Sequence, residues 1–294
     1  MNKIFKSVLS LLIFMLIVPT VQASDLLPKK QRKATINLVA VGDSLTEGVG
    51  DTTNQQGYTK RTAAMLKATY KVKVKTANFG KAGDRSDQIL KRLKKNPKAV
   101  KALDKADVIV MTVGGNDLQQ TLFDAVFAKN AASVTKVVNK SIPTYTTKLQ
   151  KLVNYLRQTN TKAPIFLFGN YNPLYVYFAN RPELNHAVQK YNAVNITTAG
   201  LRANMYYVST FKTLTYGQYT TDAARDELVK TANMANAGSV KNKVVSKTLD
   251  GKNKAKNIYI TNQDYYHPNN SGYDRMSALL VKSMMEHQKG WLKK

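Results

Sequence analysis

The sequence predicts an α/β fold, a three-layer α/β/α sandwich with a central parallel sheet. Apolar runs of strand length alternate along the chain with longer segments whose apolar residues recur at helical spacing. Three of these runs, 35–42, 106–115 and 164–170, are apolar at nearly every position, which is typical of strands covered on both faces. Strands that alternate with helices form right-handed crossovers, and these place helices on both faces of the sheet.

The other elements follow the same alternation. Two further strands are expected at 70–80 and 206–211. Helices are expected at 58–69, at 86–105 with an interruption at Pro97, at 143–159 and at 183–200. Within the third of these, one apolar stripe at helical spacing is formed by Tyr145, Leu149, Leu152, Val153 and Leu156.

A last helix is expected close to the C-terminus. Its apolar face is formed by Met276, Leu279, Leu280 and Met284. Ser271 and Asp274 have the spacing of a capping box, which predicts that the helix begins at this pair.

Residues 212–257 fit the alternation poorly. They are polar, they include the basic stretch KNKVVSKTLDGKNKAK, and they are long for a connection within a compact domain. We interpret them as an inserted basic surface excursion, helical around 222–235. The rest of 24–294 is long enough for one domain with a substantial core.

The first 23 residues have the pattern of a secretory signal peptide. Lys3 and Lys6 precede an apolar stretch that ends at Pro19 and the small-residue sequence VQAS. We expect cleavage after Ala23 and a secreted protein. The apolar stretch is short for a membrane span, which needs about 20 residues.

Charge and composition indicate the partners. The chain has a net charge of +27 and no cysteine, so disulfides and thiolate metal sites do not contribute. An exported protein this basic is expected to associate electrostatically with an anionic membrane or cell-wall surface. No recognition motif for nucleic acid is present. The sequence does not determine the oligomeric state.

Polar residues follow the predicted strands, where ligands of open α/β sheets bind. Ser44 follows the first strand in GDS, Gly83 follows the second in KAGD, and Asn116 follows the third in GGND. Asp264 and His267 lie in DYYH, shortly before the last helix.

These residues form a complete set for hydrolysis. Ser44 is the candidate nucleophile, His267 the base that activates it, and Asp264 the group that orients the imidazole. An oxyanion would be stabilised by the backbone N–H groups of Ser44 and Gly83 and by the side-chain amide of Asn116.

Other acidic and histidine residues are given structural roles. Asp43, Asp84 and Asp117 are expected to bind loop backbone rather than take part in catalysis. The three histidines lack the spacing of metal ligands, so neither a metal nor another cofactor is expected.

The motifs resemble those of SGNH hydrolases, the GDSL esterase and lipase family. GDSLTEG, the glycine of KAGD, GGND and DYYH occur in the order of the family's blocks across residues 42–267. GNYNP and HPNNSGY resemble secreted bacterial lysophospholipase-like acylhydrolases in particular. The resemblance implies a flavodoxin-like fold and metal-free ester hydrolysis through an acyl-enzyme. It also implies the roles given above for Ser44, Gly83, Asn116, Asp264 and His267.

The substrate is less well defined. Apolar residues in LQQTLFDAVF and NPLYVYFANRP are expected to lie over the catalytic edge, either as an acyl pocket or as the core beneath their own loops. The leading hypothesis is a secreted serine esterase acting on lipid or lysophospholipid esters. One alternative is an O-acetyl esterase of wall or extracellular polysaccharide, and another is a non-catalytic protein that binds through its cationic surface.

Overall fold

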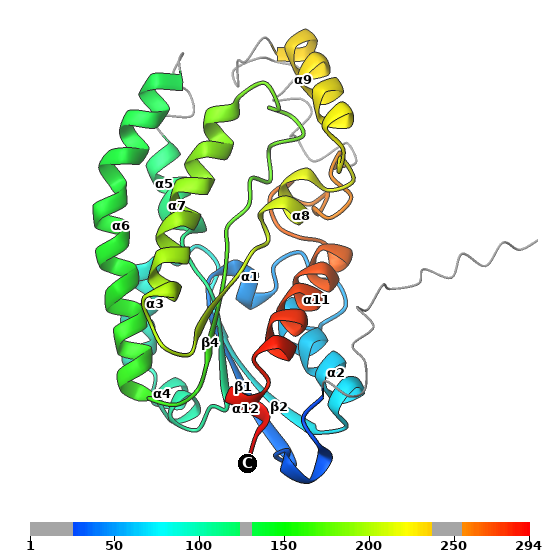
Figure 1. Ribbon diagram of the computed structural model, residues 1–294. Coiled ribbons are helices and arrows are strands. Elements are labelled where there is room, and N and C mark those ends of the chain that lie inside the picture. Colours follow the sequence, from blue (N-terminus) through cyan, green and yellow to red (C-terminus); the bar gives the residue numbers. More distant parts are fainter. Residues whose placement is uncertain (1–25, 124–130, 237–254) are drawn as a thin grey trace, which may run out of the picture.

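A computed structural model of the chain describes residues 26–123, 131–236 and 255–294 (Figure 1). Its centre is a five-stranded sheet in the order β2-β1-β3-β4-β5, and every neighbouring pair of strands is parallel. The strands are β1 (Thr35–Gly42), β2 (Lys73–Gly80), β3 (Val108–Thr112), β4 (Ile165–Phe168) and β5 (Met205–Val208). The predicted strands and the parallel sheet are confirmed.

Helices cover both faces of this sheet, so the predicted three layers are confirmed (Figure 1). One face carries α3 (Ser86–Lys94), α4 (Pro97–Asp104), α5 (Gly115–Phe123), α6 (Ala131–Thr159) and α7 (Pro182–Gly200). The other carries α2 (Tyr58–Tyr70), α11 (Asn270–Glu286) and α12 (Lys289–Leu292). Shorter or peripheral helices are η2 (Lys29–Gln31), α1 (Ser44–Glu47), α8 (Phe211–Tyr216) and α9 (Asp222–Asn236).

Successive residues of β1 supply the two cores in turn. Leu38 and Ala40 pack in the core on the α2 and α11 side, whereas Val39 and Val41 pack in the core on the α6 and α7 side. Side chains alternate between the two faces of a strand, so a strand covered on both faces must be apolar at consecutive positions. This requirement explains the unbroken apolar runs in the sequence.

The register of the sheet brings three strand ends to one level. Gly42 at the end of β1 pairs with Gly80 at the end of β2 and with Thr112 at the end of β3. The segments that leave these strands therefore begin side by side. This arrangement gathers the first three sequence motifs at one edge of the sheet.

The helix predicted at 143–159 begins 12 residues earlier than expected, because α6 runs through Pro143. A proline inside a helix removes one backbone hydrogen bond, which made Pro143 a natural first residue in the sequence. The preceding turns bury Val134 and Val138 in the core, and this packing offsets the lost bond.

The capping box predicted for the last helix is wrong. The helix α11 begins at Asn270, and its N-cap is Asn269, whose side chain accepts a hydrogen bond from the N–H of Gly272. Asp274 instead accepts a hydrogen bond from Arg61 at 2.8 Å. Asparagine is as good an N-cap as serine, and Asp274 is bound by Arg61 rather than by the N–H of Ser271.

The segment predicted as a surface excursion is only partly at the surface. It begins with α8, whose Leu214 and Thr215 are fully buried. The expected helix around 222–235 is present as α9. The basic stretch of this segment up to residue 254 and the predicted signal peptide, 1–23, lie outside the described residues. Among the helices that are described, none combines the length and the apolar character needed to cross a membrane.

Candidate active site

Ser44 is the first residue of α1, at the turn that follows β1. Asp43 caps this helix, and its carboxylate accepts a hydrogen bond from the N–H of Leu45 at 3.1 Å. Gly42 has a φ of +152°, and a Cβ there would lie 2.4 Å from the carbonyl oxygen of Thr112. Only glycine fits this turn, which therefore carries the chain directly from the buried strand to the serine.

A buried polar network lies beneath the serine. The hydroxyl of Thr46 contacts the Thr112 hydroxyl at 2.8 Å and the Tyr58 hydroxyl at 2.7 Å, and it donates to the carbonyl of Val41 at 3.1 Å. Thr112 in turn donates to the Asp43 carboxylate at 2.7 Å. Burial raises the pKa of Asp43, and the hydrogen bonds from Thr112 and Leu45 oppose that rise. The network fixes α1, and with it the position of Ser44.

His267 connects Ser44 to Asp264. Its Nε2 lies 2.8 Å from Ser44 Oγ, and its Nδ1 lies 2.6 Å from Asp264 Oδ2. Partial burial of Asp264 favours a higher pKa, but hydrogen bonds from the His267 side chain and from the His267 and Tyr266 N–H groups lower it overall. An ionised carboxylate only accepts hydrogen bonds, so Nδ1 donates to Asp264 and Nε2 is left to accept the Ser44 proton.

The loop that carries His267 is held by short-range bonds. Asp264 Oδ1 accepts from the N–H of Tyr266 at 2.8 Å and from that of His267 at 2.9 Å. The carbonyl of His267 accepts from Thr261 at 2.8 Å. Tyr265 has a φ of +56° and a ring that is 1% exposed, so burial of the ring stabilises an unfavourable backbone conformation.

The predicted oxyanion donors lie at the same edge. Gly83 has a φ of +80°, and a Cβ added there would meet nothing within 4 Å, so its backbone faces open space. Asn116 Nδ2 donates one hydrogen to the carbonyl of Asp84 at 2.9 Å and retains a second. Within the described part of the chain, no hydrogen bond occupies the N–H of Ser44 or of Gly83. The three groups are therefore available to a developing negative charge.

The other acids of the motifs bind protein groups. Asp117 binds backbone as expected, whereas the Asp84 carboxylate binds the Arg92 side chain instead of loop backbone. Asp117 accepts from the N–H of Ser86 at 2.9 Å and from its hydroxyl at 2.6 Å, and burial raises its pKa. The Asp84 carboxylate accepts from Arg92 Nε at 2.6 Å.

Arg92 supports the site from outside the sequence motifs, which did not reveal it. Besides binding Asp84, its guanidinium donates to the carbonyl of Phe79 at 2.9 Å and to that of Gly42 at 3.0 Å. It thereby ties the Gly83 loop to the ends of β1 and β2. In the sequence, Arg92 is one basic residue of the amphipathic helix α3. Basic residues on such a helix are usually exposed to solvent, so nothing in the sequence singled it out.

A cavity of about 240 Å³ opens beside these groups. It is bordered by Gly115, next to Asn116, and by Tyr266, next to His267. Apolar side chains make up much of its wall, namely Leu118, Leu122, Leu174, Leu184 and Val188.

The apolar segments divide between the wall of this cavity and the core. Leu118, Leu122 and Leu174 line the cavity, whereas Tyr175, Tyr177 and Phe178 are buried in the core. Val126 and Phe127 lie outside the described residues. Asn170 and Tyr266 also line the cavity. Both lie in sequence motifs, but the motifs gave neither residue a role.

Across residues 26–123, 131–236 and 255–294, no three His, Cys, Asp or Glu side chains are grouped closely enough to hold a metal ion.

Comparisons with known sequences identify relatives. The GDSL-like Lipase/Acylhydrolase family matches residues 40–275. The chain is 32% identical over 164 residues to the uncharacterised protein YpmR of Bacillus subtilis, a match that covers 55% of this chain and 62% of YpmR. It is 30% identical over 139 residues to the spore germination lipase LipC of Bacillus licheniformis, covering 47% and 65% of the two chains. The chain thus spans less than two thirds of either relative.

Solved structures share the fold. A lipase from a goat rumen metagenome, Lip_vut3, has a TM-score of 0.59 at 21% identity and covers 84% of this chain and 97% of its own. The extracellular lipase of Streptomyces rimosus has a TM-score of 0.53 at 18% identity, covering 84% and 99%. A variant of Axe2, an acetyl-xylooligosaccharide esterase from Geobacillus, has a TM-score of 0.52 at 17% identity, covering 87% and 96%. The family match over most of the chain shows that this protein belongs to the GDSL-like lipase/acylhydrolase family.

Proposed function

We propose that the protein is an exported serine esterase that hydrolyses lipid-type acyl esters through an acyl-enzyme. The observation that carries the proposal is the continuous hydrogen-bonded chain from Ser44 Oγ through His267 to Asp264, at 2.8 and 2.6 Å, beside an apolar cavity. A serine hydroxyl is a weak nucleophile until a base removes its proton, and this chain supplies the base.

The reaction has two halves. In the first, Ser44 Oγ attacks the ester carbonyl carbon while its proton passes to His267 Nε2. The carbonyl oxygen becomes an oxyanion, held by the Ser44 and Gly83 N–H groups and the Asn116 amide. His267 then gives its proton to the departing alkoxide, and the acyl group stays on Ser44.

In the second half, water replaces the alcohol. His267 takes a proton from the water as its oxygen attacks the acyl carbon, and the same three donors hold the second oxyanion. When the intermediate collapses, the proton returns from His267 to Ser44 Oγ and the carboxylic acid leaves. Asp264 remains ionised throughout and stabilises the imidazolium that forms in each half.

The cavity supports an acyl group larger than acetyl. A volume of 240 Å³ corresponds to about eight water-sized groups, at roughly 30 Å³ each. An acetyl group would leave most of the apolar wall exposed to water, and each buried CH₂ adds about 0.8 kcal/mol of favourable transfer. Polysaccharide O-acetyl esters are the alternative substrate.

The net charge of +27 supports attraction to an anionic surface on which such esters are presented. We propose that this surface is a membrane or a cell wall, reached after export directed by residues 1–23.

Hydrolysis of p-nitrophenyl esters of increasing chain length tests the proposal. We expect turnover by residues 24–294 that peaks at a medium chain length, with an initial burst of nitrophenol as the acyl-enzyme forms. Leu174→Trp, which narrows the cavity, should lower kcat/KM for the longer esters at least tenfold and spare the acetyl ester. Leu201→Trp is the matched control, because Leu201 is 75% exposed and does not line this cavity.

A strong preference for acetyl esters, unchanged by Leu174→Trp, would instead assign the enzyme to polysaccharide deacetylation. Turnover that survives in Ser44→Ala would contradict the serine mechanism for either substrate.

A further inference from the structure

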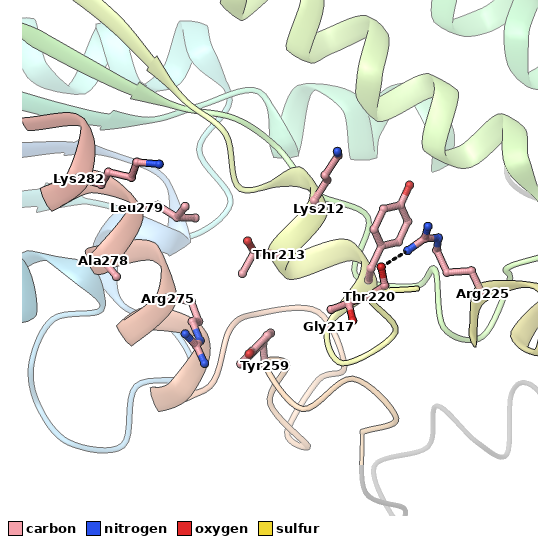
Figure 2. A pocket seen from close by; sticks show the side chains of 11 residues that line it. Lys212, Thr213, Gly217, Thr220, Arg225, Tyr259, Arg275, Ala278, Leu279 and Lys282 are labelled. Atoms are coloured by element: carbon pink, nitrogen blue, oxygen red, sulfur yellow. Dashed lines mark hydrogen bonds between the residues drawn. The ribbon is translucent and has the colours of Figure 1, made fainter. Parts of the chain in front are cut away.

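A second cavity, larger than the one beside Ser44, lies between α8 and α11. Its volume is about 580 Å³, and none of the residues Ser44, Asp264, His267 or Asn116 lines it. Figure 2 shows α11 on one side and α8 on the other, with Leu279 and Thr213 facing the space between them. We call it the α8–α11 groove.

The walls of this groove are basic. Arg275 and Lys282 come from α11, Lys212 from α8 and Arg225 from α9, and no aspartate or glutamate lines the groove. Figure 2 shows Arg275 and Lys282 along α11, Lys212 on α8, and Arg225 beyond Thr220 on the side of α8 away from α11. A concave surface lined by one sign of charge concentrates the opposite charge.

Most of this charge is not neutralised by the protein. Arg225 pairs with Asp222 at the edge of the groove. In the described part of the chain, no ion pair involves Lys212, Arg275 or Lys282. The groove therefore has at least three cations available to an anionic ligand.

The two arginines are held in position by tyrosine rings. The Arg275 guanidinium lies 5.5 Å from the ring centre of Tyr259, and that of Arg225 lies 4.9 Å from the ring centre of Tyr216. Tyr216 itself packs edge-on against Tyr175 at 5.0 Å. Cation–π contacts of this kind restrict the arginines and lower the entropy lost when they bind a ligand.

The spacing of the cations favours a ligand with several negative groups. Arg275, Ala278, Leu279 and Lys282 recur at helical spacing along one face of α11. Lys282 follows Arg275 by seven positions, so their backbones are about 10 Å apart along the helix. Figure 2 shows the two side chains at opposite ends of this face, so a ligand with several phosphate groups can contact both cations at once.

The side chains of the groove limit the class of anionic ligand further. Arginine binds phosphate through two parallel N–H groups, which suits phosphate groups in particular. Single-stranded nucleic acids commonly stack their bases on aromatic faces, yet a guanidinium already lies over each of the two tyrosines. A flat membrane would favour a convex surface with exposed apolar side chains, and none of the large exposed apolar residues of the described chain lines the groove.

We propose that the α8–α11 groove binds a flexible linear polyanion that carries repeated phosphate groups and no stacking bases. The groove is separate from the esterase centre, and its ligand is independent of which ester the enzyme hydrolyses. It holds the enzyme on a phosphate-rich polymer while the Ser44 cavity remains open.

Binding of linear polyphosphate of about 15 phosphates, measured by calorimetry at several salt concentrations, tests this inference. R275Q/K282Q should weaken binding at least tenfold. The slope of log affinity against log salt should become shallower by about 1.4, the value for two lost contacts to a single strand. Thermal unfolding and turnover of a short soluble ester should be unchanged, which shows that the variant is folded.

K98Q/K101Q is the matched control. It removes the same charge from two exposed lysines of α4 that line a second basic groove beside β1. We expect it to change polyphosphate affinity less than threefold. An equal loss in both variants would overturn the inference in favour of attraction by the whole protein surface.

Three further ligands complete the test. Orthophosphate should compete only weakly, because it reaches one cation at a time. Tighter binding of a single-stranded oligonucleotide than of polyphosphate with equal charge would overturn the inference. So would binding to phosphatidylglycerol vesicles that is lost in R275Q/K282Q while polyphosphate binding is retained.

Discussion

The two sides of the Ser44–His267 hydrogen bond are built differently. The serine side is supported from within, because Asp43, Thr46 and Thr112 are at most 3% exposed and bind one another beneath α1. The histidine side is a surface loop, in which the side chains of His267 and Asp264 are 16% and 34% exposed. The loop is held mainly by bonds between residues close in sequence.

Because of this difference, we expect substitutions on the two sides to affect different properties, either the stability of the fold or the catalysed reaction. Buried hydroxyls that lose their partners remain desolvated, so changes beneath Ser44 should affect folding first. Exposed groups can bond to water when a partner is lost, so changes in the His267 loop should affect catalysis first. Substitutions on each side of the bond test whether stability and catalysis depend on different residues.

Ser44→Ala should have the largest effect. It removes the nucleophile and leaves the network beneath it intact, so kcat should fall by about 10⁴–10⁶-fold, with the free energy of unfolding unchanged. Ester turnover and chemical denaturation measure the two quantities. A loss of stability of several kcal/mol would show that the hydroxyl is part of the buried network.

Asp264→Asn should reduce kcat by about 10³–10⁴-fold, because an amide can donate to Nδ1 and so stabilise the wrong tautomer of His267. Stability should change by about 1 kcal/mol or less, since the side chain is partly solvated. Asp226→Asn, an exposed change on α9, is the control for both measurements. A folded variant with nearly full activity would remove Asp264 from the mechanism.

Asn116→Ala should lower kcat by about 10²–10³-fold with little change in KM, because its free amide hydrogen is used only when the oxyanion forms. It also frees the carbonyl of Asp84 from its bond. Stopped-flow and steady-state turnover check the expectation. An equal change in KM would instead indicate a role in binding the ground state.

The pH dependence should report a single protonation. Hydrogen bonds hold the pKa of Asp264 below its usual value despite partial burial, so its carboxylate stays ionised in mild acid. A general base acts only when it is unprotonated, so log kcat/KM should fall on acidification with a slope no steeper than 1 while Asp264 stays ionised. Circular dichroism at each pH confirms folding. A slope of 2 in mild acid would show that Asp264 takes up a proton there as well.

Thr46→Val should have the smallest effect on chemistry and the clearest effect on stability. It leaves the hydroxyls of Tyr58 and Thr112 short of a partner, which should lower the free energy of unfolding by about 1–3 kcal/mol. We expect kcat to change only a few fold. A larger loss of activity than of stability would mean that the buried network tunes Ser44 directly.

The sequence by itself determined the parallel sheet and the motif residues of the site. β1 was predicted over its full length, because a strand covered on both faces leaves an unbroken apolar run. Ser44, Gly83 and Asn116 were found because each follows a predicted strand, and parallel strands end at one edge. His267 and Asp264 were found through their own motif.

Tertiary structure decided what depends on partners distant in sequence. Arg92 joins two strand ends and the Gly83 loop, contacts that no local pattern encodes. Asp274 left its predicted capping role because Arg61, 213 residues away, binds it. The α8–α11 groove likewise exists only where two helices meet. Local periodicity reports which residues are buried, whereas the pairing of buried or facing side chains is set by how the elements pack.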